Sequence, residues 1–123
     1  MSLIKKYPLE DEEQIAFINW FKSKYKDYLI FSIPNGGSRN KIEASKLKKT
    51  GLLPGIPDLI ILMPNKEILF LEMKRQKGGN LSTVQKVIIK LIEKLGFTVL
   101  IGYGFLDAKS KFENYLLQKV TQN

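Results

Sequence analysis

Apolar and polar residues recur along the chain with two spacings, one typical of helices and one typical of strands. Apolar residues at helical spacing predict helices at residues 9–26, 78–97 and 107–120. Runs rich in Ile, Leu, Val and aromatic residues predict strands at residues 28–33, 58–63, 68–74 and 97–104. The basic segment 38–51, closed by Gly51, predicts a shorter helix. The order α-β-α-β-β-α-β-α predicts a mixed α/β domain with a sheet of about four strands.

The helix predicted at 78–97 and the strand after it show the clearest local signals. Ser82 has the side chain and position of an N-cap, and Gly96 follows the last turn. The apolar stripe expected to face the core consists of Val84, Val87, Ile88, Leu91, Ile92 and Leu95. The strand at 97–104 carries no charge, so we expect it at the centre of the sheet.

The predicted hairpin with the turn sequence "PNKE" carries charges where apolar residues are expected. Asp58 opens its first strand, and Glu72 and Lys74 interrupt the end of its second. With a two-residue turn at 65–66, Asp58 lies opposite Met73, and a shift of one residue places it opposite Glu72 or Lys74. Because side chains alternate between faces, Glu72 and Lys74 share a face. We therefore expect the three charged groups to meet at one end of the hairpin.

Two carboxylates held close together repel each other, and burial strengthens the repulsion. A divalent cation removes the conflict, since Mg²⁺ prefers hard oxygen ligands and commonly takes one or two carboxylates with water and phosphate. Lys74 could then neutralise a phosphate oxygen or help to ionise an attacking water. The alternative is an edge-strand ion pair between Asp58 and Lys74, with Glu72 in solvent. The apolar surroundings favour a site over this ion pair.

The first predicted helix offers a further carboxylate. At ~100° per residue, Glu10 aligns with Phe17 and Phe21 on the apolar face, whereas Glu13 is rotated ~60° away. Glu10 could therefore point at the end of the sheet, with Gln14 one turn later to orient it. The alternative role for Glu10 is to stabilise the helix dipole from the first turn.

Gln85 lies on the apolar line of the later helix, beside Ile88 and Ile92, and therefore needs a polar partner. The carboxylate end of the hairpin is close to it along the chain. A glutamine near a helix start is also common without any role in a site. We assign Ser82 as a cap rather than a catalyst.

The amino-acid composition excludes several kinds of catalytic and metal-binding site. The 123 residues suffice for one domain, which we place at 1–123, and they include no cysteine and no histidine. Disulfides, thiolate metal sites, histidine acid–base chemistry and Ser-His-Asp triads are therefore excluded. No apolar run is long enough to cross a membrane, and no secretory signal pattern is present, so we expect a cytoplasmic protein.

The net charge is +8, from 20 basic and 12 acidic residues, which favours a polyanionic partner such as nucleic acid. In the loop "PNGGSRNK", the glycines allow a phosphate to approach the backbone and the cations add charge, although an ordinary turn is an equal alternative. A basic track beside the site could include Lys46, Lys48, Lys49, Lys74, Arg75 and Lys77. Tyr103 and Phe105 could stack on bases, but we expect them to pack in the core.

These motifs, taken in order, resemble the VRR-NUC domain (virus-type replication-repair nuclease) of the PD-(D/E)xK nuclease superfamily. The resemblance spans most of the chain. It is carried by "E-x-x-x-Q" at Glu10 and Gln14, "IPNGGSR" at 33–39, "G-x-PDL" at 55–59, "LEMKRQKGG-x-LS-x-x-Q" at 71–85, and the helix exit at Gly96 and Phe97. The resemblance implies a restriction-endonuclease-like fold, with a mixed four-stranded sheet flanked by helices.

By motif position, the resemblance implies the role of each residue. Asp58 and Glu72 are metal ligands, with the Met73 carbonyl as a further one. Lys74 is the catalytic lysine, and Gln85 is the glutamine of the closing motif. Glu10 is the helix carboxylate and a further metal ligand, although Glu13 fits some variants of the first motif. The nucleic-acid-binding residues are expected to be Asn35, Gly36, Gly37, Ser38, Arg39, Lys41, Arg75 and Lys77.

The activity implied by the resemblance is a Mg²⁺- or Mn²⁺-dependent endonuclease that hydrolyses phosphodiester bonds in DNA. We expect selectivity for branched DNA such as Holliday junctions. Because one active centre cuts one strand, symmetric incision implies a homodimer. The alternatives are a nuclease that acts on linear duplex or RNA, and a non-catalytic nucleic-acid-binding module on the same fold.

Overall fold

The computed structural model describes residues 7–34, 45–46 and 48–121. Its helices are α1 (Glu10–Lys24), α3 (Thr83–Lys94) and α4 (Phe105–Thr121), and its strands are β1 (Leu29–Ser32), β2 (Leu59–Met63), β3 (Glu67–Lys74) and β4 (Thr98–Tyr103). The short basic helix expected at 38–51 lies mostly outside the described residues, but the described positions 45–46 and 48–49 are helical. The elements otherwise follow the predicted order.

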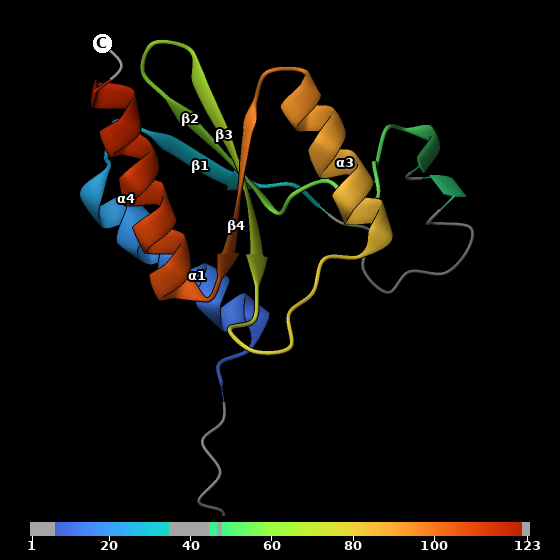
Figure 1. The fold of residues 1–123 in the computed structure, drawn as a ribbon. Coiled ribbons are helices and arrows are strands. Elements are labelled where there is room, and N and C mark those ends of the chain that lie inside the picture. The colour runs from blue at the N-terminus through green and yellow to red at the C-terminus, as the bar shows by residue number, and fades with distance from the viewer. Residues whose placement is uncertain (1–6, 35–44, 47, 122–123) are drawn as a thin grey trace, which may run out of the picture.

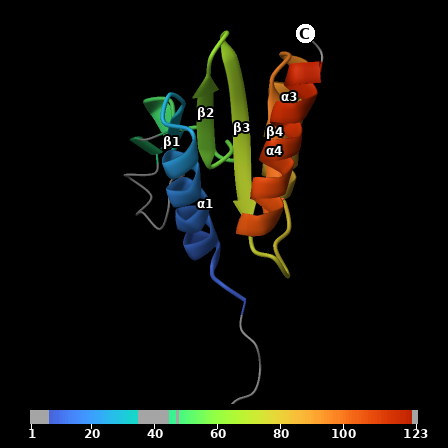
Figure 2. The same cartoon turned by 90° about the vertical axis from the view of Figure 1, so that its left-hand side faces the viewer.

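The four strands form one mixed sheet in the order β1-β2-β3-β4. β1 and β2 are antiparallel, β2 and β3 are antiparallel, and β3 and β4 are parallel. Helices α1 and α4 lie together on one face of the sheet, and α3 lies on the other (Figure 1). In the rotated view, α1 and α4 stand in front of the strands (Figure 2). The predicted mixed four-stranded sheet flanked by helices is therefore confirmed.

Each face of the sheet packs against its own helices, because side chains alternate along the strands. The larger core lies under α1 and α4 and includes the fully buried residues Phe17, Phe21, Leu59, Ile61, Leu69, Leu71, Met73 and Phe112. The smaller core lies under α3 and is built on Ile89, Ile92 and Val99, with Phe70 packed against them. On β3, Phe70, Glu72 and Lys74 thus alternate away from the larger core and towards the α3 side.

The hairpin register differs by one residue from the two-residue-turn expectation. Asn65 and Lys66 both have positive φ, of 64° and 65°, as a tight turn requires. Met63 nevertheless pairs with Glu67, so three residues separate the paired positions and Leu59 lies opposite Leu71. Continuing this register places Asp58 opposite Glu72 rather than Met73.

The expectation that the strand at 97–104 is central was wrong. Among the described strands, β4 pairs only with β3 and forms an edge of the sheet. Its apolar character reflects cover from α4 on one face and α3 on the other. Two side chains of α4 also satisfy its outer backbone groups: Asp107 Oδ2 accepts from Tyr103 N–H at 2.8 Å, and Lys111 Nζ donates to the Ile101 carbonyl at 2.6 Å.

The apolar face of α3 was also predicted only in part. Ile88 and Ile92 pack on the sheet side, and Ile89, which was not in the predicted stripe, is buried with them. The other predicted members are exposed, namely Val84, Val87, Leu91 and Leu95. Apolar residues occupy more than half of the circumference of α3, so their spacing alone does not select the buried face.

Candidate functional site

Asp58 and Glu72 lie together on the α3 side of the sheet, at the start of β2 and near the end of β3. The backbone N–H of Asp58 donates to Glu72 Oε1 at 3.2 Å, and the backbone N–H of Met73 donates to Asp58 Oδ2 at 2.9 Å. These reciprocal bonds orient both carboxyl groups with main-chain donors. The hairpin therefore brings the two predicted carboxylates into one site.

Glu72 is almost completely enclosed, with 1% of the surface of the residue exposed. Its Oε2 accepts from Gln85 Nε2 at 2.9 Å and lies 3.5 Å from Lys74 Nζ. Burial, followed by the negative charge of Asp58, raises the pKa of Glu72 to about 7, although Lys74 acts in the opposite direction. A carboxyl group that titrates near neutrality in a pocket is typical of a functional site.

Gln85 is held in place by the helix that carries it. Ser82 is the N-cap of α3, and its Oγ accepts from Gln85 N–H at 3.1 Å. In return, Gln85 Oε1 accepts from Ser82 N–H at 2.9 Å, which completes a capping box. Because the amide oxygen is engaged by Ser82, the amide nitrogen is directed at Glu72. The segment "LS-x-x-Q" thus both starts a helix and orients a carboxylate, and the assignment of Ser82 as a cap is confirmed.

The structure separates the two candidate carboxylates of α1. Glu10, the first residue of the helix, lines the same pocket as Asp58, Glu72 and Lys74. Burial raises the pKa of Glu10, and the charge of Asp58 adds to the rise while Lys74 opposes it. Glu13 is not among the residues lining that pocket and accepts a hydrogen bond from Gln76 Nε2 at 2.8 Å. Gln14 does not line the pocket either.

The pocket has a volume of about 840 Å³ and lies between α1, β2, β3 and the beginning of α3. Its polar lining combines Glu10, Asp58, Glu72, Lys74 and Gln85 with an apolar wall of Leu52, Pro54, Leu81 and Val84. Lys48 and Asn80 also line it. Sequence reasoning missed Asn80, which lies two residues before Ser82; its position between "GG" and "LS" was the available signal.

The donors in this pocket suit a hard divalent cation. Asp58 and Glu72 supply two carboxylates, and Mg²⁺ or Mn²⁺ completes such a pair with water and phosphate oxygens. Within the described part of the chain, no group of three or more acidic side chains is close enough to hold a metal ion by itself. A cation bound here would therefore depend on this pair, and Glu10, which lines the same pocket, is a further oxygen donor. Met73 is not among the residues that line the pocket.

The remaining predicted residues are distributed unevenly. Asn35, Gly36, Gly37, Ser38, Arg39 and Lys41 lie outside the described residues. Arg75 and Lys77 are exposed just after β3. Phe105 packs against the larger core, as expected, whereas Tyr103 is partly exposed and has Lys111 Nζ at 5.2 Å from its ring centre.

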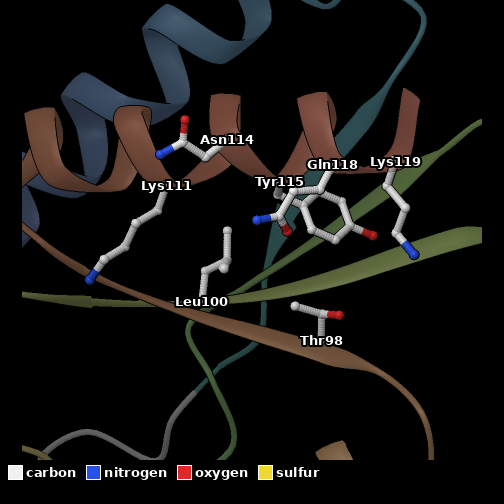
Figure 3. Close-up of a pocket in the computed structure, with 7 residues that line it drawn as sticks. All are labelled: Thr98, Leu100, Lys111, Asn114, Tyr115, Gln118 and Lys119. Carbon is white, nitrogen blue, oxygen red and sulfur yellow. The ribbon is translucent and has the colours of Figure 1, made fainter. Parts of the chain in front are cut away.

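A separate hollow of about 310 Å³ lies between β4 and α4 and is lined by seven residues (Figure 3). Its two lysines are engaged within the fold. Lys111 forms an ion pair with Asp107 at 2.9 Å, and Lys119 forms one with Glu67 at 3.3 Å. The Tyr115 hydroxyl donates to the same Glu67 at 2.9 Å. The two contacts with Glu67 join α4 to β3, and the residues that line the hollow include none of the carboxylates of the site.

Comparisons with known proteins agree with the fold. The sequence model of the VRR-NUC domain family matches residues 3–105. A solved structure described as a VRR-NUC domain protein is 30% identical, and the similarity covers 90% of each chain with a TM-score of 0.74. A second, described as a VRR-NUC domain, is 20% identical over 86% of this chain and 96% of that one, with a TM-score of 0.63, and shows likeness of fold. No curated protein matches the sequence.

The matched region contains both strands of the hairpin and the start of α3, which build the pocket. Among the described residues, no helix is long and apolar enough to span a membrane. The chain belongs to the VRR-NUC domain family and is a nuclease-type domain.

Proposed function

We propose that the protein is a metal-dependent endonuclease that hydrolyses phosphodiester bonds in DNA. The observation that carries the proposal is the convergence of Asp58, Glu72 and Lys74 in one pocket, with Glu72 held by Gln85. Phosphodiester hydrolysis requires charge stabilisation around phosphorus and an activated water. Two carboxylates and a lysine meet that requirement without histidine or cysteine, neither of which the chain contains.

Asp58 and Glu72 are the proposed ligands of Mg²⁺ or Mn²⁺, with Glu10 and the Met73 carbonyl as further donors. When bound, the cation supplies Lewis-acid stabilisation of phosphate and lowers the pKa of water. Gln85 keeps Glu72 oriented through its amide N–H. Lys74 lines the pocket and is 9% exposed, so a phosphate oxygen in the pocket would meet its ammonium group in a poorly hydrated setting. In such a setting the charge acts strongly.

The proposed DNA interface extends from the pocket over basic residues and glycines. Arg75 is the residue after Lys74, Lys77 lies two residues further on, and Lys48 lies on the pocket wall. Ile33 N–H donates to the Asp58 carbonyl at 2.9 Å, so Ile33 lies beside the site, and in the sequence it is followed closely by the segment 35–41. That segment contributes the proposed contacts Asn35, Gly36, Gly37, Ser38, Arg39 and Lys41. A net charge of +8 supports backbone contacts to DNA.

For the substrate, we propose branched DNA such as a Holliday junction, cut by a homodimer. The described part of the chain contains one such pocket, and one pocket cuts one strand, so paired incisions need two chains related by symmetry. Sedimentation of the protein alone and with a junction measures this directly. A monomer that remains monomeric on the junction would remove the dimer from the proposal.

The decisive experiment incubates the protein with end-labelled four-way junction, flap, linear duplex and RNA, with Mg²⁺, with Mn²⁺ and with EDTA. We expect junction cleavage only with metal, and a Lys74→Ala protein that binds the junction but cuts at least about 100-fold more slowly. Lys94→Ala, at the exposed far end of α3, is the matched control and should cut normally. Metal-independent binding without products from the unmodified protein would support the non-catalytic module instead.

A further inference from the structure

Glu13 is a buried carboxylate outside the proposed chemistry. It lies in the first turn of α1, and 5% of its surface is exposed. No cationic side chain among the described residues forms an ion pair with it, and its Oε2 accepts a hydrogen bond from Gln76 Nε2 at 2.8 Å. Burying a carboxylate costs free energy compared with burying an apolar residue, and the hydrogen bond from Gln76 offsets part of that cost.

The partner, Gln76, follows β3 two residues after Lys74. Gly104 follows the last residue of β4, and its N–H donates to the Lys74 carbonyl at 2.9 Å. This bond fixes the end of β3 next to the end of β4. Gly104 has a φ of 91°, and a Cβ atom at this position would collide with both Glu13 Oε2 and the Gln76 side chain. The absence of a side chain at Gly104 therefore lets α1, β3 and β4 meet at this hydrogen bond.

The hydrogen bond between Glu13 and Gln76 lies close to two residues of the site that are far apart in the sequence, Glu10 and Lys74. Glu10 lies three residues before Glu13, on the same turn of α1, and Lys74 lies two residues before Gln76. Gln76 lies in the turn that follows β3, and the hydrogen bond from Gly104 N–H to the Lys74 carbonyl holds the start of that turn. On the other side of the bond, a single helix turn is stiff over so short a distance. The hydrogen bond between Glu13 and Gln76 therefore sets how far the Glu10 end of α1 lies from the Lys74 end of β3.

We propose that Glu13 and Gln76 form a positioning pair that fixes Glu10 on α1 relative to Lys74 and Asp58 across the pocket. This inference rests on the proposed nuclease function. Neither residue of the pair contacts the substrate. Displacement of a positioned group by about 1 Å can cost about 100-fold in rate without loss of substrate binding, so the pair should influence kcat more than KM.

The test exchanges the two side chains. Gln76→Glu places two carboxylates against each other, and we expect kcat for junction cleavage to fall about 100-fold with KM changed less than about threefold. The double variant Glu13→Gln/Gln76→Glu again has one amide and one carboxylate, with the donor on α1, and should recover kcat to within about fivefold of the unmodified protein. Gln76→Ala removes the donor without adding charge and serves if Gln76→Glu does not fold. Glu12→Gln, exposed in the same turn, is the matched control.

A second readout is independent of cleavage. Mn²⁺ titration without DNA should show weaker binding by several-fold in Gln76→Glu, because Glu10 is displaced from the pocket, and recovery in the double variant. Single variants that keep the unmodified kcat and Mn²⁺ affinity would overturn the inference, as would a folded double variant that stays as slow as Gln76→Glu. If the unmodified protein cuts no substrate, the proposed function fails, and the Mn²⁺ titration still tests the pair.

Discussion

Asp58 and Glu72 are joined through the main chain, since the Asp58 N–H donates to Glu72 Oε1 at 3.2 Å while the Met73 N–H donates to Asp58 Oδ2 at 2.9 Å. Backbone donors in paired strands hold the two carboxyl groups in place despite their mutual repulsion. The consequence is electrostatic: burial and the charge of Asp58 raise the pKa of Glu72 to about 7. The fold thus keeps two acidic groups in an arrangement that a cation would relieve.

Metal affinity should depend on pH because a carboxyl ligand must lose its proton to bind a cation. With the pKa of Glu72 at about 7, Mn²⁺ affinity is expected to rise about tenfold per unit of pH below neutrality and to level off above pH 8. Calorimetric titration between pH 5.5 and about 8.5 measures this. An affinity that stays constant over this range would contradict the proposed role of Glu72.

The same group should make the metal-free fold less stable as the pH rises. The pKa of Glu72 is about 7 in the folded protein, whereas its ordinary pKa, which applies to the unfolded chain, is 4.5. The folded state binds more protons between these values, so the free energy of unfolding falls across this window, by on the order of 2 kcal/mol. Urea unfolding in EDTA at several pH values tests this. Glu72→Gln, which cannot titrate, should show a clearly smaller decrease.

The N-cap of α3 should influence both stability and the site. Ser82→Ala removes the acceptor for Gln85 N–H and is expected to lower the free energy of unfolding by about 1 kcal/mol. Because the capping box also orients the Gln85 amide towards Glu72, we expect cleavage to slow by roughly tenfold. Ser110→Ala, at an exposed position of α4, should change neither quantity. A Ser82→Ala protein with reduced stability and normal cleavage would restrict Ser82 to capping.

Two adjacent residues of α3 test which face of the helix is buried. Ile92 is 8% exposed and Leu91 is 52% exposed. Ile92→Ala should therefore cost about 2–4 kcal/mol of unfolding free energy, whereas Leu91→Ala should cost less than about 1 kcal/mol. Chemical denaturation of both variants supplies the comparison. Equal losses would mean that Leu91 is covered in solution, for example by a second chain.

Local sequence patterns predicted the elements and much of the candidate site because both depend on short-range geometry. Alternation along a strand places Glu72 and Lys74 on one face whatever the rest of the fold does. The serine at position 82 and the glutamine at 85 have the spacing of a capping box, so the helix start was also readable. The helical projection of α1 likewise pointed Glu10 towards the sheet end, where Glu10 lines the pocket. It did not predict that Glu13 is buried with Phe17 and Phe21.

Tertiary structure decided what local patterns leave open, because several arrangements satisfy the same periodicity. One additional residue in the turn moved Asp58 from Met73 to Glu72, although the turn residues were as expected. β4 is apolar through helix cover rather than through a central position.

The rotation of α3 about its axis was also decided by tertiary packing and not by the local sequence pattern. Its apolar residues extend around more than half of the helix, and packing against Phe70 and Val99 buried Ile89 while leaving Leu95 77% exposed. That rotation also directs Gln85 at Glu72. The residue types and their spacing therefore determined which groups are available, and the summed packing of α1, α3 and α4 on the sheet determined which of them meet.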